Sequence, residues 1–144
     1  MKESITCAME ERMKKTNNFR KAILNDANVS GGDFKGICLV DAELNGANLT
    51  DSNLTFSYLE NAEMSSAILV RTNLRCAILT NCNLTSADMR KADLRRAYLR
   101  FALFFGTDMR GVKFDENTDF TFAKFDENTK MDNDLMAFIT AQKV

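Results

Sequence analysis

The stretch "ANLTDSNLTFSYLENAEM", residues 47–64, repeats a large apolar side chain at every fifth position. Leu49, Leu54, Leu59 and Met64 occupy these positions, and a small residue lies two places before each of them. Five residues advance an α-helix by about 500°, so on a helix these side chains would spiral around the rod. On a flat strand each step of five would reverse the face, and half of the side chains would point to water. The period therefore predicts a chain that turns one corner in each five-residue repeat.

This five-residue register continues far beyond the quoted stretch. It runs from Phe19 to Phe114 as 20 consecutive repeats, and it holds twelve of the chain's 14 leucines. Two places before the large residue, 18 of the 20 residues are Ala, Gly, Ser, Thr, Cys or Val. Both positions are expected to point inward, while backbone groups of successive turns bond along the axis at a spacing of about 4.8 Å. The pattern predicts a solenoid whose units are stable only when they are stacked.

Several segments resemble the pentapeptide repeat family, whose repeat has the form A(D/N)LXX. They are "ANLTDSNLT", "ADMRKADLR" and "ADLRRAYLRFALFF", and the resemblance extends over residues 17 to about 131. It implies an all-β solenoid, a right-handed quadrilateral β-helix with four repeats in each coil and about five to six coils in this chain. The residues just before the large position offer independent support, since the apolar ones include Cys38, Tyr58, Ile78 and Tyr98, spaced 20 apart.

The two ends of the register depart from the strict period. "FDENTDF" (114–120) and "FDENTKM" (125–131) place large residues six apart, which predicts corners widened by one residue. Within a single domain, we expect an N-terminal capping helix over 1–16, the β-helix over 17–131 and a C-terminal capping helix over 132–144. Leu135, Met136 and Ile139 lie at helical spacing in the last segment. Their apolar face predicts a cap or, as the alternative, a dimer contact across a two-fold axis.

Composition excludes several classes of function. The chain has 144 residues, a formal net charge of −1 and no histidine. Without histidine, a cysteine pair of CxxC spacing or a glycine-rich phosphate loop, we predict no catalytic residue, no metal ligand and no cofactor site. No apolar run is long enough to span a membrane, and the charged N-terminal segment lacks a signal core, which favours a cytoplasmic protein with reduced cysteines.

An apolar stripe on the outside is the first candidate interaction surface. Tyr58, Ile78 and Tyr98 are expected to stack on one outer face, with Phe101, Leu103 and Phe105 near its lower corner. Clustered exposed aromatic side chains often mark contact surfaces. The alternative is that the tyrosines only stabilise each other as neighbours in the sheet.

A basic belt is the second candidate. Residues 71–113 carry 9 basic and 3 acidic side chains, between two acidic ends. The candidate patch consists of Arg71, Arg75, Arg90, Lys91, Arg95, Arg96 and Arg110. A period of 20 residues would stack like charges at about 4.8 Å, and that repulsion needs compensation from a bound anion or from Asp88, Asp93 and Asp108. A solvated arginine-rich face therefore stays open beside a binding patch.

These observations favour a non-enzymatic scaffold that binds a protein partner through its outer faces, with a homodimer as an open alternative. The family resemblance suggests a second function, because certain members resemble DNA, bind DNA gyrase or topoisomerase IV and protect bacteria from quinolones. Such mimicry requires a strongly acidic surface in place of phosphates, which a net charge of −1 and a basic belt meet poorly. Direct binding of nucleic acid through the belt is the weakest hypothesis.

Overall fold

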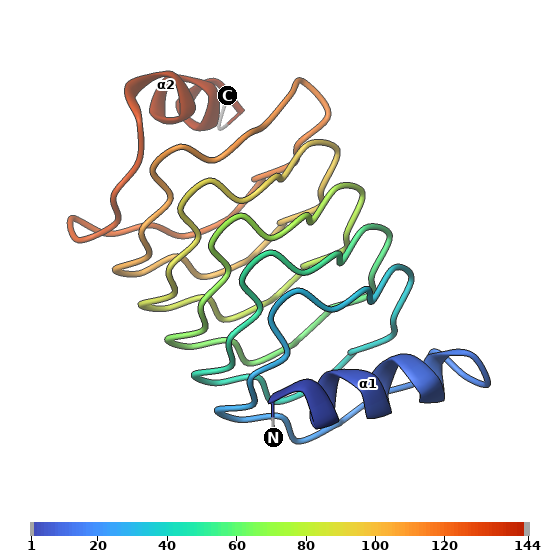
Figure 1. The fold of residues 1–144 in the computed structure, drawn as a ribbon. Helices are drawn as coiled ribbons and strands as arrows, with labels where there is room; N and C mark the ends of the chain where they lie inside the picture. Colours follow the sequence, from blue (N-terminus) through green and yellow to red (C-terminus); the bar gives the residue numbers. More distant parts are fainter. Residues whose placement is uncertain (1, 143–144) are drawn as a thin grey trace.

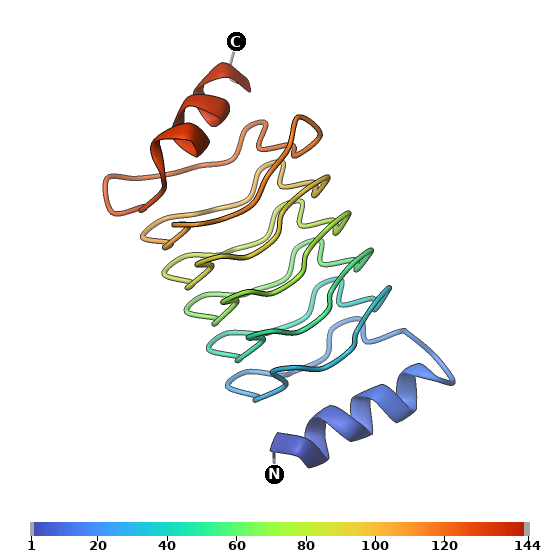
Figure 2. The ribbon, with the colours of Figure 1, turned by 45° about the horizontal axis from the view of Figure 1, so that its top comes forward.

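The computed structural model describes residues 2–142, and their side chains from residue 5 onward. Two helices, α1 (Lys2–Met13) and α2 (Asn133–Gln142), lie at opposite ends of a stack of coils (Figure 1). The chain between them winds as one continuous solenoid, and successive coils lie in register above one another (Figure 2). The predicted corner in each repeat is therefore present along the stack.

Hydrogen bonds between coils are concentrated at one residue on each side of the square. Parallel β-bridges join residues 20 apart, from Asn18↔Cys38 to Asp93↔Lys113, in four columns around the coil. In one of them the Tyr58 amide donates to the Ile37 carbonyl at 2.9 Å, and the Leu39 amide donates to the Tyr58 carbonyl at 2.7 Å. Each side has only five residues including its corner, which leaves one residue per side to bridge to the next coil. Each β-ladder is therefore a column of single bridges rather than a pair of conventional strands.

A tight turn makes each corner. At a typical one the Ala62 amide donates to the Leu59 carbonyl at 3.0 Å, with Glu60 and Asn61 between them. The second of these central residues has a positive φ, 61° at Asn61, and the same sign recurs every five residues from Lys21 to Gly111. A positive φ at this position defines a type II turn, which favours glycine or asparagine. Among the described residues, fifteen with positive φ are nevertheless not glycine.

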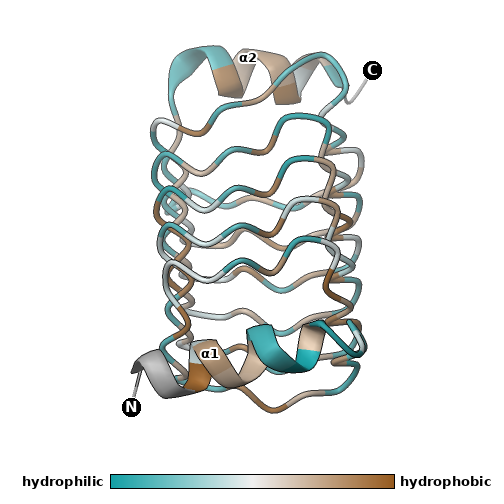
Figure 3. Ribbon diagram, turned by 45° about the vertical axis from the view of Figure 1, so that its right-hand side comes forward, coloured by the Kyte–Doolittle hydropathy of each residue, from teal (hydrophilic) through white to brown (hydrophobic). Residues whose placement is uncertain are grey.

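The interior is filled by the two inward positions of the register. Leu44, Leu54 and Leu59 are completely buried, and so are most alanines at the small position, whereas Ala22 and Ala27 near the N-terminal end are half-buried. At Gly32 even a methyl group would not fit, because a Cβ atom there would lie 2.3 Å from the ring of Phe34. Figure 3 shows the two helices at the ends of a column of coils whose polar and apolar residues alternate along the chain. The core is thus a stack of side-chain layers.

Two wider corners change the period near the C-terminal end, as the sequence predicts. The bridge partners become 21 residues apart at Tyr98↔Asp119 and 22 apart at Asp108↔Lys130. At the first wide corner the Thr118 amide donates to the Asp115 carbonyl, and the Asp115 amide donates to the Thr118 hydroxyl, each at 3.0 Å. The Asp115 carboxylate also accepts from the Arg96 amide at 3.1 Å, so it replaces a backbone acceptor of the regular ladder.

The helices pack against the end coils through a few side chains. Met9 of α1 is buried, and Arg12 lies over the ring of Phe19 at 4.6 Å from its centroid. Leu135 and Ile139 of α2 are buried in the same core as the coil residues. Across residues 2–142 the structure has no helix with the length and apolar character needed to cross a membrane.

Candidate interaction surfaces

One side of the coil carries the predicted apolar stripe. Tyr58, Ile78 and Tyr98 are consecutive members of one β-ladder, which begins with Asn18 and Cys38 and ends at Asp119. Tyr58 is 45% exposed and Tyr98 is 49% exposed, while Ile78 between them is half-buried. We call this side the tyrosine face. The sheet therefore brings together residues separated by 20 and 40 positions in the sequence.

Phenylalanines occupy the corners that border the tyrosine face. Phe56 lies at the corner before Tyr58 and is 55% exposed, and Phe101 lies at the corner after Tyr98 and is 47% exposed. Phe122 lies one coil beyond Phe101, is 59% exposed, and stacks on its ring with centroids 5.1 Å apart. The leucine register gave no signal for Phe56 or Phe122. Their signal is the corner position itself, two places after each large residue.

These phenylalanines are costly to place where they are. Each has a positive φ, 59° at Phe56, 61° at Phe101 and 63° at Phe122. A non-glycine residue in this region costs about 1–2 kcal/mol, and a bulky one is unusual there. None of the three gains a buried environment in return. Neither turn geometry nor core packing explains them. Their contacts lie at the surface, where Phe101 stacks on Phe122 and the Lys35 ammonium lies 5.7 Å from the ring centroid of Phe56, and this favours a role at the surface.

Leu103 and Phe105 lie away from the stripe, contrary to their predicted place in one cluster with it. Leu103 belongs to the next ladder, between Asn83 and Lys124, and is half-buried. Phe105 follows it on that side and is also half-buried. The chain turns its corner at Phe101, so residues after this corner face a direction different from that of Tyr98.

Charged groups flank the aromatic residues of the tyrosine face. The Arg100 guanidinium lies 5.6 Å from the centroid of Phe122 and 6.0 Å from that of Phe101, within the usual range of a cation–π contact. Arg100 also lies 3.9 Å from the carboxylate of Asp119. Two coils away, Glu60 occupies the same place in its repeat as Arg100, and its Oε2 atom has no hydrogen-bond partner among the described residues.

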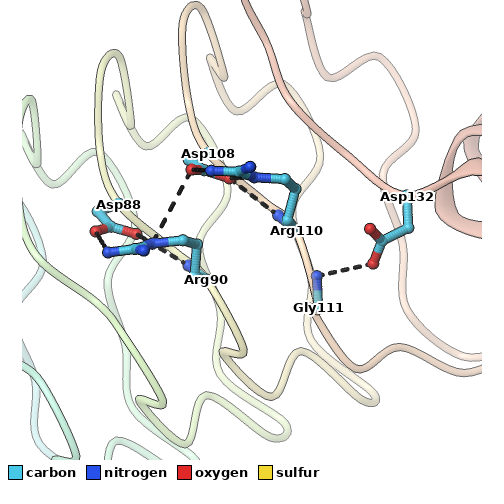
Figure 4. Close-up of polar contacts among 6 residues, drawn as sticks. All are labelled: Asp88, Arg90, Asp108, Arg110, Gly111 and Asp132. Carbon is cyan, nitrogen blue, oxygen red and sulfur yellow. Dashed lines mark hydrogen bonds and ion pairs between the residues drawn. The ribbon is translucent and has the colours of Figure 1, made fainter.

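The basic belt is largely neutralised within the chain. Arg90 pairs with Asp88 at 2.7 Å, and Arg110 pairs with Asp108 at 2.6 Å (Figure 4). The same spacing, an aspartate two residues before an arginine, gives an ion pair at 2.5 Å between Asp93 and Arg95. Arg71 instead pairs with Asp51 of the preceding coil at 2.7 Å. Internal aspartates thus provide much of the compensation for stacking like charges.

The ion pairs shift the pKa values of their members in the expected directions. Hydrogen bonds from the Arg90 and Arg110 guanidinium groups hold the pKa of Asp88 and of Asp108 below the usual value for an aspartate. At Asp93, burial raises the pKa, but hydrogen bonds from Arg95 outweigh it and the net shift is downward. Carboxylates with such shifts stay ionised at neutral pH, so the paired arginines are not available to bind a second anion at full strength.

Some cations of the belt remain without a carboxylate partner. Among residues 5–142, no described carboxylate lies within ion-pair distance of Arg75, Lys91 or Arg96, the other three members of the predicted patch. Arg71, Lys91 and Lys113 line one shallow depression together with Asn73 and Asp93. This arrangement has cations on its rim but shows no buried polar group aimed into it.

The three predicted dimer-contact residues have different environments. Leu135 and Ile139 are 1% and 4% exposed, because α2 turns them toward the end coil, whereas Met136 is 53% exposed. The Gln142 side chain fixes the far end of α2, accepting from the Phe120 amide at 2.8 Å and donating to the Thr118 carbonyl at 2.6 Å. Leu135 and Ile139 are therefore unavailable for a dimer contact, which corrects that alternative for these two residues.

The cysteines form no site in the described part of the chain. Cys82 is fully buried, where burial raises the pKa of its thiol and its Sγ donates to the Leu59 carbonyl at 2.8 Å. Cys38 and Cys76 are half-buried, and Cys7 is exposed. Residues 5–142 contain no group of three or more carboxylates or cysteines placed to hold a metal ion.

The family model described as pentapeptide repeats matches residues 37–75, 77–115 and 92–127, with eight copies, and so covers more than half of the chain. The chain belongs to the pentapeptide repeat family. This assignment confirms the resemblance seen in the sequence, and it supports the right-handed quadrilateral β-helix as the fold.

Solved structures of the same fold are similar over most of the chain. A pentapeptide repeat protein (Rfr23) from the cyanobacterium Cyanothece 51142 is 27% identical, with 88% of this chain and 99% of that chain covered and a TM-score of 0.81. A trypsin-treated variant of QnrB1, a plasmid-mediated fluoroquinolone resistance protein, is 14% identical, with 87% and 71% covered and a TM-score of 0.50. A pentapeptide repeat protein of the Arabidopsis thaliana thylakoid lumen is 21% identical, with 82% and 77% covered and a TM-score of 0.48. No curated protein sequence matches the chain.

Proposed function

We propose that this pentapeptide repeat protein is a non-enzymatic scaffold that binds another protein through the tyrosine face. One observation carries the proposal: five aromatic side chains on this face and its borders are between 45% and 59% exposed, and three of them occupy unfavourable positive-φ corners. They are Phe56, Tyr58, Tyr98, Phe101 and Phe122. Aromatic residues are enriched in the buried centres of protein interfaces, where they contribute most of the binding energy.

The rest of the molecule suits the role of a rigid support. The ladder holds each outer side chain at a fixed distance from the next, so the face is pre-organised and loses little entropy on binding. We further propose that α1 and α2 cap a solenoid of a little under six coils, preventing end-to-end stacking of molecules, and that the protein works in the cytoplasm.

A capture experiment with matched variants tests this proposal. Wild type, Tyr58→Lys/Tyr98→Lys and Ile23→Lys are used as baits for proteins of the source cell. Ile23 is the matched control, because it occupies the same place in its repeat on a neighbouring side and is 73% exposed. We expect wild type and Ile23→Lys to retain the same proteins and the double variant to lose them. Retention of an identical set by all three baits would refute the tyrosine face as the binding site.

Binding of DNA gyrase or topoisomerase IV is the second candidate. The fold likeness to QnrB1 favours it, although an identity of 14% supports the fold alone. The surface offers little resemblance to a row of phosphates, because the formal net charge is only −1 and arginines pair with carboxylates such as Asp88 and Asp108. Supercoiling by gyrase is measured with and without the protein and a quinolone. Unchanged supercoiling and unchanged quinolone inhibition would end this hypothesis.

A further inference from the structure

We propose that the partner of the tyrosine face is a second copy of the same face, joined antiparallel about a two-fold axis that passes over Ile78. This inference rests on the proposed function, because it names the protein that the same surface binds. The axis lies in the plane of the interface and runs along the side of the coil, so each coil of one copy meets a coil of the other in reverse order.

The order of residues along the ladder is what selects this axis. Ile78 lies midway between Tyr58 and Tyr98, one coil from each. A two-fold axis over Ile78 therefore sets Ile78 against itself and Tyr58 against Tyr98 of the second copy, and the latter contact occurs twice. The result is a continuous strip of apolar and aromatic contacts, in which every exposed tyrosine of either copy is covered.

The charges at the edge of the face are complementary in the same arrangement. Glu60 and Arg100 occupy equivalent places two residues after Tyr58 and Tyr98, so the axis brings Glu60 of one copy to Arg100 of the other, again twice. Among the described residues Glu60 has no ion-pair partner, and Arg100 is held at this edge by Phe101, Phe122 and the Asp119 carboxylate at 3.9 Å. Two residues before each tyrosine, Phe56 meets Arg96, an exposed cation, in a further cation–π contact.

The alternative two-fold axis, parallel to the solenoid, lacks this complementarity. This axis would place each coil opposite the same coil of the second copy, with the chains of the two facing sides running in opposite directions. Arg96 would then face Arg100 of the second copy at two places, and Phe56 would face Glu60. Like charges placed directly opposite each other are destabilising, so the antiparallel arrangement is preferred.

The size of the face indicates a weak dimer. The face is about five coils high, at about 4.8 Å per coil, and five residues wide, at about 3.3 Å per residue. The projected area of the interface, summed over both copies, is therefore roughly 600–800 Å². Stable complexes usually bury at least about 1,200 Å². Association is therefore expected to depend on protein concentration, with electrostatic pairing fixing the orientation more than it adds affinity.

Charge exchange between two variants tests the pairing directly. Glu60→Arg and Arg100→Glu each replace both inter-copy attractions by repulsions, so each variant alone should associate at least about tenfold more weakly than wild type, a change of about 1.4 kcal/mol. In a mixture the heterodimer restores both attractions, and sedimentation equilibrium should recover wild-type association to within about twofold. A mixture that associates no better than the separate variants would overturn the proposed pairing. Circular dichroism of each variant checks that the coil is intact.

Cysteine cross-linking distinguishes the two axes in a chain whose Cys7, Cys38 and Cys76 are serine. A disulfide requires Cβ atoms about 3.8 Å apart. Ile78→Cys and the double variant Tyr58→Cys/Tyr98→Cys should both cross-link efficiently. Tyr58→Cys alone should not cross-link, because the two copies of residue 58 lie about 10 Å apart along the solenoid. Efficient linkage of Tyr58→Cys alone, or linkage of the outer-side control Ile68→Cys equal to that of Ile78→Cys, would overturn the antiparallel dimer.

The two proposals fail in different ways. If wild type stays monomeric from about 1 to 500 µM, a range that spans micromolar affinities, the second copy is not the partner. Proteins captured by wild type and lost with Tyr58→Lys/Tyr98→Lys would still uphold the tyrosine face as a binding site. If wild type stays monomeric and the captured proteins are also retained by Tyr58→Lys/Tyr98→Lys, the proposed function fails as well.

Discussion

Two serines at equivalent places in adjacent repeats should respond to the same substitution with opposite signs. Ser52 and Ser57 both point into the core, with 1% and 0% of their surface exposed. The Ser52 hydroxyl donates to the Leu49 carbonyl at 2.7 Å, whereas the Ser57 hydroxyl has no hydrogen-bond partner among the described residues. Alanine fits the Ser57 column, since Ala77 and Ala97 occupy the same place in the next two coils and are fully buried.

The magnitude follows from the cost of burying a hydroxyl group. A buried hydroxyl without a partner costs about 1–3 kcal/mol, so Ser57→Ala is expected to raise the free energy of unfolding by about 1 kcal/mol or more. Ser52→Ala removes a made hydrogen bond and should lower it by about 1 kcal/mol. With a urea m-value of about 2 kcal/mol/M, the two midpoints should move about 0.5 M in opposite directions from wild type.

Urea unfolding followed by far-ultraviolet circular dichroism measures both midpoints under the same conditions. The slopes of the three transitions should agree, because neither substitution changes the surface exposed on unfolding. A fall in the Ser57→Ala midpoint equal to that of Ser52→Ala would refute the reasoning, since it would mean that the Ser57 hydroxyl is satisfied in the folded protein.

Three further predictions concern the core, the ion pairs and the thiols. Leu74→Ala should cost about 2–5 kcal/mol of unfolding free energy in urea titrations, because the side chain is completely buried in a layer that cannot collapse; a loss below about 1 kcal/mol would contradict a close-packed core. The pKa values of Asp88 and Asp108 are lowered in the folded state, so their contribution to the free energy of unfolding is present above the unfolded pKa near 3.8 and is lost as the pH falls below it. In thermal melts, the variant Asp88→Asn/Asp108→Asn should therefore lose less stability than wild type between about pH 5 and pH 2. The difference should be about 1 kcal/mol or less per ion pair. In native protein a maleimide should modify Cys76 and leave Cys82 untouched until the chain unfolds, as mass spectrometry of labelled peptides would show; equal labelling of both would contradict the burial of Cys82.

The fold could be predicted because its cause is local and repeated. Every fifth large residue forces a corner, and the same rule explains the widened corners at "FDENT", where the bridge spacing grows from 20 to 21 and then to 22. The amphipathic pattern of α2 could not decide between a cap and a dimer contact, because both require one apolar face. The structure shows that Leu135 and Ile139 face the coil.

The surfaces were harder to predict because they depend on which side chains the corners display. Phe56 and Phe122 carry no periodic signal, and only the corner geometry brings them to the borders of the tyrosine face. The 20-residue period predicts the like-charge stack of the belt, and compensation by aspartates is one of the two alternatives that the sequence allows. The aspartate two residues before Arg90, Arg95 and Arg110 is the sign in the sequence that these three arginines fold back onto their own coil.

The two tyrosines offer the most direct test of where this protein binds. The chain contains two tyrosines and no tryptophan, and both tyrosines lie on the tyrosine face, so the intrinsic fluorescence reports on this face alone. Quenching of the emission by acrylamide is measured as the protein associates with itself or with a captured partner. We predict efficient quenching of the monomer, where Tyr58 and Tyr98 are 45% and 49% exposed, and a clear fall in the quenching constant on association. Association that leaves the quenching constant unchanged would contradict it.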